Sequence, residues 1–189
     1  GANVVITEVD PLPALRAIMD GYRVMTMDEA ALIGDIFCTA TGMKDIIVER
    51  HFATMKDGAI VANTGHYDCE IAVEALESTA KSVRTIRRDN EEFTMPNGNK
   101  IFLLARGRLV NLAAAEGHPS EVMDMSFANQ FLSLCRLAKE SESMDNLVYD
   151  ITLEQDQALA TTKLETLGFT IDELTQEQID YKDDYTAGT

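Results

Sequence analysis

The segment AIVANTGHYD, residues 59–68, carries the strongest indication of the fold. Its first four residues are apolar or small, as in a short buried strand, and Asn63 begins a polar loop that contains Gly65 and His66. Glycine lets the backbone approach a ligand closely. A histidine beside such a glycine, at the carboxyl end of a strand, is less often purely structural than a lone histidine. The segment therefore predicts a strand of an α/β sheet followed by a ligand-facing loop.

The same alternation of short β-rich runs and helical runs extends over residues 1–105 and predicts a parallel α/β sheet. Expected strands are 4–8, 23–26, 36–39, 59–63, 83–86 and 100–105, and expected helices are 10–19, 27–33, 45–55 and 70–78. The turn PNGN at 96–99 should join two neighbouring strands. Beyond it, residues 120–138 predict a long and largely buried helix, and further helices follow near 153–167 and 176–181.

Composition narrows the classes of partner. The 189 residues carry 16 basic and 32 acidic side chains, a net charge of −16, which makes nucleic acid a poor partner. No apolar run approaches the length of a membrane span, and no signal peptide opens the chain, so no membrane partner is expected. Three widely spaced cysteines have no metal-ligand spacing and favour a reducing, cytoplasmic compartment.

Glu8 ends an expected strand, and an acid at the end of the second strand of a dinucleotide-binding fold accepts hydrogen bonds from ribose hydroxyls. An exposed strand-end acid is the simpler interpretation. The glycine-rich turn that normally precedes such an acid by about 20 residues does not fit between Gly1 and Glu8. We therefore expect a Rossmann-like sheet whose first strand and glycine-rich turn are missing.

Other candidate residues follow later expected strands. Thr39 and Thr41 flank a strand end where small residues would admit a phosphate or ribose, although a plain strand-to-helix turn is the alternative. Asn111 can both donate to and accept from a carboxamide. His118 lies in GHPS, which interrupts the helical pattern where we expect a domain to end, a place where hinges and ligands meet. We interpret His51, inside an expected helix, as a surface or packing residue.

Ordered motifs along nearly the whole chain resemble the S-adenosylhomocysteine hydrolase (adenosylhomocysteinase) family, in its C-terminal NAD-binding and dimerisation portion. The motifs include TEVDP at 7–11, MDEA at 27–30, GHYDCEI at 65–71, GRLVNL at 107–112, GHPS at 117–120, SFANQ at 126–130 and LTQEQ at 174–178. The end at 181–185 is similar to the short-tailed archaeal and thermophilic members.

The resemblance implies an NAD-dependent hydrolase of one-carbon metabolism. In the family, bound NAD oxidises the 3′-hydroxyl of the substrate ribose, the acidified C4′ hydrogen leaves and homocysteine is eliminated. Water then adds, the hydride returns, and adenosine is released. The family's main acid and base residues precede Gly1, so this chain alone is expected to be inactive and to bind NAD weakly.

Site residues are carried over by the same resemblance. Glu8 would bind the NAD ribose, and His66 with Tyr67 would match a substrate-channel gate in which Tyr67 replaces the usual Phe. His66 and His118 would assist catalysis, His118 at the adenosine site and hinge. Pro13 replaces a cofactor-facing residue of many relatives. The full set of expected cofactor-site positions is Glu8, Pro13, Thr39, Thr41, Thr64, Gly65, His66, Asn111 and His118, and no metal is expected.

Three parts are expected. Residues 1–117 would form the partial NAD-binding domain, 118–150 a helix returning to the substrate domain, and 151–189 a helical oligomerisation segment. The full-length protein would form a homo-oligomer, a dimer or a homotetramer. Three alternatives remain open: a non-catalytic module that binds NAD or a subunit, an S-inosylhomocysteine hydrolase, and an NAD-dependent 2-hydroxyacid dehydrogenase.

Overall fold

The computed structural model describes residues 1–182, and the chain divides into two compact units, Gly1–Gly117 and His118–Thr189. The first unit is a mixed α/β unit, and the second holds the C-terminal helices. Residues 183–189 lie outside the described residues. They include most of the short tail at 181–185 and the end of the chain at 186–189.

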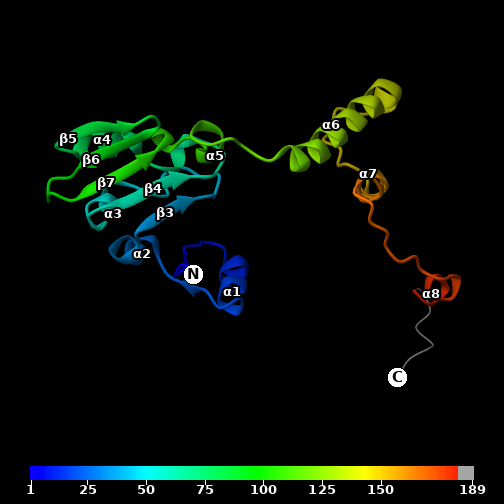
Figure 1. Ribbon diagram of the computed structural model, residues 1–189, viewed down its shortest axis with the longest axis horizontal. Helices are drawn as coiled ribbons and strands as arrows, with labels where there is room; N and C mark the ends of the chain where they lie inside the picture. The colour runs from blue at the N-terminus through cyan, green and yellow to red at the C-terminus, as the bar shows by residue number, and fades with distance from the viewer. Residues whose placement is uncertain (183–189) are drawn as a thin grey trace. The chain divides into compact units, whose positions relative to one another are not determined.

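A five-stranded sheet forms the centre of the first unit (Figure 1). Its strands are β3 (Ile36–Thr39), β4 (Ala59–Asn63), β7 (Lys100–Leu104), β6 (Asn90–Thr94) and β5 (Ser82–Arg87), in that spatial order. The strands β3, β4 and β7 are parallel, whereas β6 is antiparallel to both of its neighbours. The expected sheet is thus confirmed as α/β, but it is mixed rather than wholly parallel. The connections on either side of β6 are too short for the crossover that parallel strands need.

A separate two-stranded parallel sheet pairs β1 (Val5–Ile6) with β2 (Arg23–Val24), and α1 (Pro11–Met19) connects them. A cavity of about 720 Å³ separates β1 from β3 and is lined by both. In a doubly wound sheet with the order 3-2-1-4-5-6, the first strand fills this position. No strand within residues 1–182 occupies it.

Local signals explain the first helices. The Asp10 side chain caps α1 by accepting a hydrogen bond from the Leu12 N–H, and Pro11 occupies the first turn, where its missing N–H is no loss. Helix α2 (Met27–Ile33) begins with a capping box formed by Thr26 and Glu29. Both helices begin close to the residues expected from the sequence.

Two expected helices are shorter than predicted. The segment 45–55 contains only α3 (Glu49–Phe52), and in place of the helix expected at 70–78 the 3₁₀ turn η1 (Asp68–Glu70) is followed by α4 (Val73–Thr79). The reason is a parallel β-bridge between Ile47 and Ile71, which holds both segments extended. His51 on α3 is buried and packs, with Nδ1 accepting from the Val48 N–H and Nε2 3.0 Å from an Asp28 carboxylate oxygen.

The core of the first unit lies between the sheet and α2, α3 and α4. It is a single cluster of buried side chains: Ala31, Phe37, Ile47, Phe52, Met55, Ala59, Val61, Ile71, Leu76, Phe93, Met95, Ile101 and Leu103. The strands β4 and β7 are among its main contributors, which fixes their carboxyl ends on a rigid scaffold.

The second unit contains α6 (Ser120–Glu140), α7 (Leu153–Thr166) and α8 (Gln176–Tyr181). None of these three helices contains a buried residue, so the expectation that 120–138 is largely buried is wrong for this chain. Phe127, Phe131 and Leu134 are exposed on α6. Polar contacts join α6 to α7, including Asn129 Nδ2 to Asp156 Oδ1 at 2.7 Å. Within residues 1–182, no helix is both long and apolar enough to cross a membrane.

Candidate functional site

The loops after β3, β4 and β7 meet at the carboxyl ends of these strands, which we call the loop edge of the sheet. These three strands are adjacent and parallel, so their carboxyl ends point the same way. In open α/β sheets, ligands bind outside the carboxyl ends of the strands. The three loops comprise residues 40–42, 64–67 and 105–109, and they hold four of the nine cofactor-site positions expected from the sequence, Thr41, Thr64, Gly65 and His66.

Asn63, the last residue of β4, joins these loops and is completely buried. Its Oδ1 accepts hydrogen bonds from Thr39 Oγ1 at 3.0 Å and from the Gly65 N–H at 2.6 Å. Its Nδ2 donates to the carbonyls of Tyr67 at 2.8 Å and Gly107 at 2.9 Å. One amide side chain thus satisfies its full hydrogen-bonding capacity by connecting all three parallel strand ends.

Glu70, at the end of η1, is also completely buried. Its Oε2 accepts from the Thr41 N–H and Thr41 Oγ1, both at 2.9 Å, and its Oε1 accepts from the Gly42 N–H at 2.8 Å. Burial alone would raise the pKa of Glu70, but the hydrogen bonds from Thr41 and Gly42 outweigh it and hold the pKa below its ordinary value. The carboxylate therefore stays ionised at neutral pH.

Gly65 lies directly against this carboxylate. A Cβ at that position would overlap the Glu70 carboxyl group and would come within 3.0 Å of Asn63 Oδ1. The glycine is needed here for space, and a larger residue would displace the Glu70 side chain.

The third loop begins with the turn η2 (Ala105–Gly107), in which all three residues are left-handed, with φ of 51°, 53° and 75°. Such conformations are uncommon for residues other than glycine. Two charged contacts hold Arg106 in place, one with Glu91 at 2.9 Å and one with Glu77. The turn leads into α5 (Val110–Ala113), which carries Asn111.

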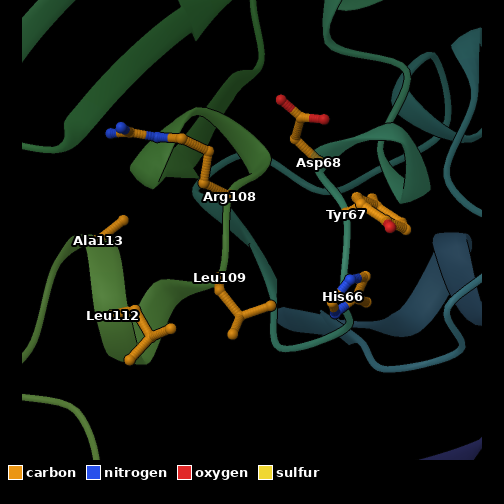
Figure 2. Close-up of a pocket in the computed structure, with 7 residues that line it drawn as sticks. All are labelled: His66, Tyr67, Asp68, Arg108, Leu109, Leu112 and Ala113. Carbon is orange, nitrogen blue, oxygen red and sulfur yellow. The ribbon is translucent and has the colours of Figure 1, made fainter.

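A cavity of about 410 Å³ lies between the loop after β4 and the segment that leads into α5 (Figure 2). His66 and Tyr67 line one side, with their rings in edge-to-face contact at a centroid separation of 4.1 Å. Leu109 and Leu112 lie on the α5 side. An exposed imidazole beside an apolar wall can exchange a proton with a bound ligand.

The larger cavity, between β1 and β3, brings together Glu8, Thr39 and Thr41. Glu8 Oε1 accepts from the N–H groups of Val9 at 2.6 Å and Asp10 at 3.0 Å. These two backbone hydrogen bonds, Asp10 first, lower the pKa of Glu8 and keep it ionised. Its Oε2 takes part in neither bond and can accept from a ligand hydroxyl.

The structure groups the expected residues unevenly. Thr64 is linked to Thr39, because its N–H and Oγ1 both donate to the Thr39 carbonyl, at 2.7 and 3.2 Å. Asn111 lies on α5 but does not line either cavity described above, and Pro13 is an exposed residue of α1 outside both linings. His118 belongs to the second unit.

The sequence patterns did not single out Asn63 and Glu70, the two buried residues whose side chains hydrogen-bond the strand-end loops together. The sequence nevertheless contains a feature that could have pointed to each. Asn63 is the single amide that closes an otherwise apolar strand, and Glu70 stands inside the GHYDCEI motif immediately before the buried Ile71.

The residues that line the larger cavity fit one part of an NAD-binding site, the part that holds a ribose. Glu8 is an ionised acceptor suited to ribose hydroxyls, and the cavity it lines is bounded by the hydroxyl-bearing Thr39 and Thr41. A glycine-rich phosphate turn is not among residues 1–182. Within residues 1–182, no cluster of three or more His, Cys, Asp or Glu side chains could hold a metal ion.

Comparison with known proteins shows which family the chain belongs to. Residues 1–117 match the family model described as "S-adenosyl-L-homocysteine hydrolase, NAD binding domain". An adenosylhomocysteinase of Saccharolobus solfataricus is 52% identical over all 189 residues, and the match covers 45% of its own length. An adenosylhomocysteinase of Aeropyrum pernix is 54% identical over 178 residues, which are 94% of this chain and 43% of that protein.

An S-inosyl-L-homocysteine hydrolase of Methanocaldococcus jannaschii is 53% identical over the whole chain and 45% of its own length. The chain thus spans a little under half the length of these relatives. Taken with the fold, the match places the chain in the S-adenosyl-L-homocysteine hydrolase family, whose NAD-binding domain residues 1–117 match.

Proposed function

We propose that this chain is the cofactor-binding part of an enzyme that reversibly hydrolyses S-adenosylhomocysteine to adenosine and homocysteine with bound NAD. The observation that carries the proposal is the convergence of three strand-end loops on Asn63, because it brings Thr39 and Gly65 together with Tyr67 and Gly107 at the carboxyl ends of the strands. Bound NAD would supply the hydride acceptor and donor.

Each candidate residue has a proposed task. Glu8 accepts hydrogen bonds from the adenosine ribose of the cofactor through its free Oε2. Thr39 and Thr41 line the same cavity. Pro13, on α1, stands where many relatives have a cofactor-facing residue, so this chain lacks that contact with NAD. At the nicotinamide end, Thr64, Gly65, His66 and Asn111 orient the ring and its carboxamide.

His66 is proposed to assist the chemistry and, with Tyr67, to gate substrate entry. The two rings lie together at the mouth of the smaller cavity, where a tilt of either would alter access. His118 is proposed to assist at the adenosine site and hinge. The main acid and base groups would come from other parts of the full-length protein.

We also propose the remaining organisation. Residues 118–150 would return to the substrate domain, and 151–189 would serve in homo-oligomer formation, as a dimer or tetramer. The exposed apolar side chains of α6 support a packing partner beyond this unit. The free Cys38, Cys69 and Cys135 support a reducing, cytoplasmic location.

S-inosylhomocysteine is the second candidate substrate, because the Methanocaldococcus jannaschii relative with that printed name is as similar as the adenosylhomocysteinases. The two substrates differ at the purine, so a direct comparison separates them. The non-catalytic module and the 2-hydroxyacid dehydrogenase remain as the outcomes expected if neither substrate is turned over.

The experiment uses the full-length protein that carries this sequence. We expect it to retain NAD on purification and to release homocysteine from one of the two substrates. The 189-residue chain alone should show no turnover and should bind NAD more weakly than micromolar. Turnover by this chain that is lost on His66→Ala or His118→Ala would contradict the proposed division of labour, as would sub-micromolar NAD binding by the chain alone.

A further inference from the structure

We propose that Glu70 is a positioning residue whose buried carboxylate fixes the loop after β3 against the loop after β4, and so sets the geometry of the cofactor site. The inference rests on the proposed function, because it assigns Glu70 a role toward NAD that operates through other residues. Glu70 itself need not touch the cofactor.

The contacts of Glu70 reach both loops. Its two oxygens accept three hydrogen bonds from Thr41 and Gly42, which follow β3, and its carboxyl group packs on Gly65, which follows β4. Among residues 1–182, no Lys, Arg or His forms an ion pair with it. The negative charge is therefore stabilised by backbone and hydroxyl donors alone, which requires those donors to keep their positions.

The three donors select a carboxylate specifically. Two N–H groups and one hydroxyl face the two carboxylate oxygens. A glutamine of the same shape would turn an NH₂ group toward one of these donors, leaving donor facing donor in a buried site. A role limited to filling space would tolerate glutamine, whereas a role that depends on the accepted hydrogen bonds would not.

The two loops lead directly to the candidate cofactor residues. Thr41 lines the cavity that also contains Glu8, and Gly65 immediately precedes His66, which lines the other cavity. A shift of the loop at Thr41 relative to Gly65 would therefore misalign one part of the cofactor site against the other. Misplacement of this kind lowers rates even when no contacting residue is changed.

The first experiment compares Glu70→Gln with Glu74→Gln in the full-length protein. Glu74 is an exposed residue of α4, so its substitution removes the same charge without touching the loops. We expect Glu70→Gln to raise the NAD dissociation constant about 10- to 100-fold, the range for losing a hydrogen bond to a charged group. It should also lower kcat more than it raises KM, and Glu74→Gln should stay within about twofold of wild type in both.

Measurements are made well below the melting temperature of each variant, so that lost folding does not mimic lost positioning. If wild type binds NAD and Glu70→Gln binds it within about twofold as tightly, the inference is overturned while the proposed function stands. If wild type binds no NAD, the proposed function fails and the role of Glu70 toward the cofactor fails with it.

A second experiment tests the hydrogen bonds without any cofactor. In amide NMR spectra of the 189-residue chain, the Thr41 and Gly42 signals should lie downfield and shift as Glu70 is protonated. Glu70→Gln should move both signals upfield and abolish that titration, whereas Glu74→Gln should leave them in place. Unchanged chemical shifts of the Thr41 and Gly42 amides in Glu70→Gln would overturn the inference.

A third experiment uses the contact between Glu70 and Gly65. Gly65→Ala should move the Thr41 and Gly42 amide signals of the 189-residue chain upfield, because the added methyl group displaces the Glu70 carboxylate that these N–H groups bond to. The double variant Gly65→Ala, Glu70→Ala should then move these two signals no further than Glu70→Ala alone, because the two changes damage the same contact. Shifts at Thr41 and Gly42 that add in the double variant would show independent effects and overturn the inference.

Discussion

Replacing Asn63 with alanine should be the most damaging single change at the loop edge. The amide is completely buried and exchanges four hydrogen bonds with Thr39, Gly65, Tyr67 and Gly107. Alanine removes all four and leaves their partners without the groups they were bonded to. Water can reach the exposed Tyr67 more easily than the buried Thr39 and Gly107, so the partners are not affected equally.

The expected loss in the free energy of unfolding is about 2–4 kcal/mol. Four hydrogen bonds at a net of about 1 kcal/mol each set the upper end. Rehydration of the Tyr67 carbonyl and partial relaxation of the loops reduce the figure toward about 2 kcal/mol. Asn63→Asp gives a complementary result, because its second oxygen would face the Tyr67 and Gly107 carbonyls and repel them at neutral pH.

Urea unfolding of the 189-residue chain at pH 7 measures this loss, followed by circular dichroism and by amide signals of β4, which report on the first unit. The control is Asn97→Ala, because exposed Asn97 makes a local turn bond to the Asn99 N–H at 2.9 Å. We expect the control to lose about 0.5 kcal/mol, as surface changes usually do. A loss below about 1 kcal/mol for Asn63→Ala, with an unchanged m-value, would refute the reasoning.

Three further outcomes are expected. Glu8→Ala should weaken NAD binding by the full-length protein about 10-fold or more in a calorimetric titration, because it removes the acceptor for the ribose, and an unchanged affinity would contradict that role. Asn111→Ala should instead slow hydride transfer, read as NADH absorbance in single-turnover experiments, more than it reduces NAD affinity. The contribution of Glu70 to stability should be fully present above its ordinary pKa of 4.5 and should be lost as pH falls through its lower folded-state pKa, so the difference between wild type and Glu70→Gln in urea unfolding should shrink only in acid.

Local sequence signals predicted much of the first unit. The apolar runs at 36–39 and 59–63 became β3 and β4 with the same bounds, and the helix expected at 27–33 became α2. The signals failed where long-range pairing decided the outcome. The helix expected over 45–55 is cut short because Ile47 bridges Ile71, a contact that no local pattern contains.

Burial of the helix at 120–138 could not be predicted from its apolar content alone. Residues such as Phe127, Phe131 and Leu134 indicate a surface that packs against something, and periodicity does not say whether that surface belongs to the same chain. The apolar character was correctly recognised, whereas its burial within this chain was the wrong inference.

The same distinction applies to the candidate site. Gly65, His66 and Thr41 stand in short motifs that can be recognised locally. The importance of Asn63 and Glu70 comes from partners as far away in sequence as Gly107 and Thr41, 44 and 29 residues distant. Their side chains look unremarkable until the sheet brings those partners together.

Replacing Asn63 and replacing Glu70 should have different effects, because only Asn63 reaches the turn at Gly107 and only Glu70 bonds the N–H groups of Thr41 and Gly42. Asn63 joins Thr39 and the loop after β4 to the turn at Gly107, so its loss should disturb the smaller cavity that contains His66. Glu70 joins the loop after β3 to Gly65, so its loss should first disturb Thr41 and the larger cavity. The Asn63→Ala variant should therefore shift the amide signals at 66–68 and 107–112 as well as that of Thr39, whereas Glu70→Gln should confine its shifts to 39–43 and Gly65. Identical shift patterns in the two variants would contradict this distinction and would mean that the three loops respond together to the loss of either side chain.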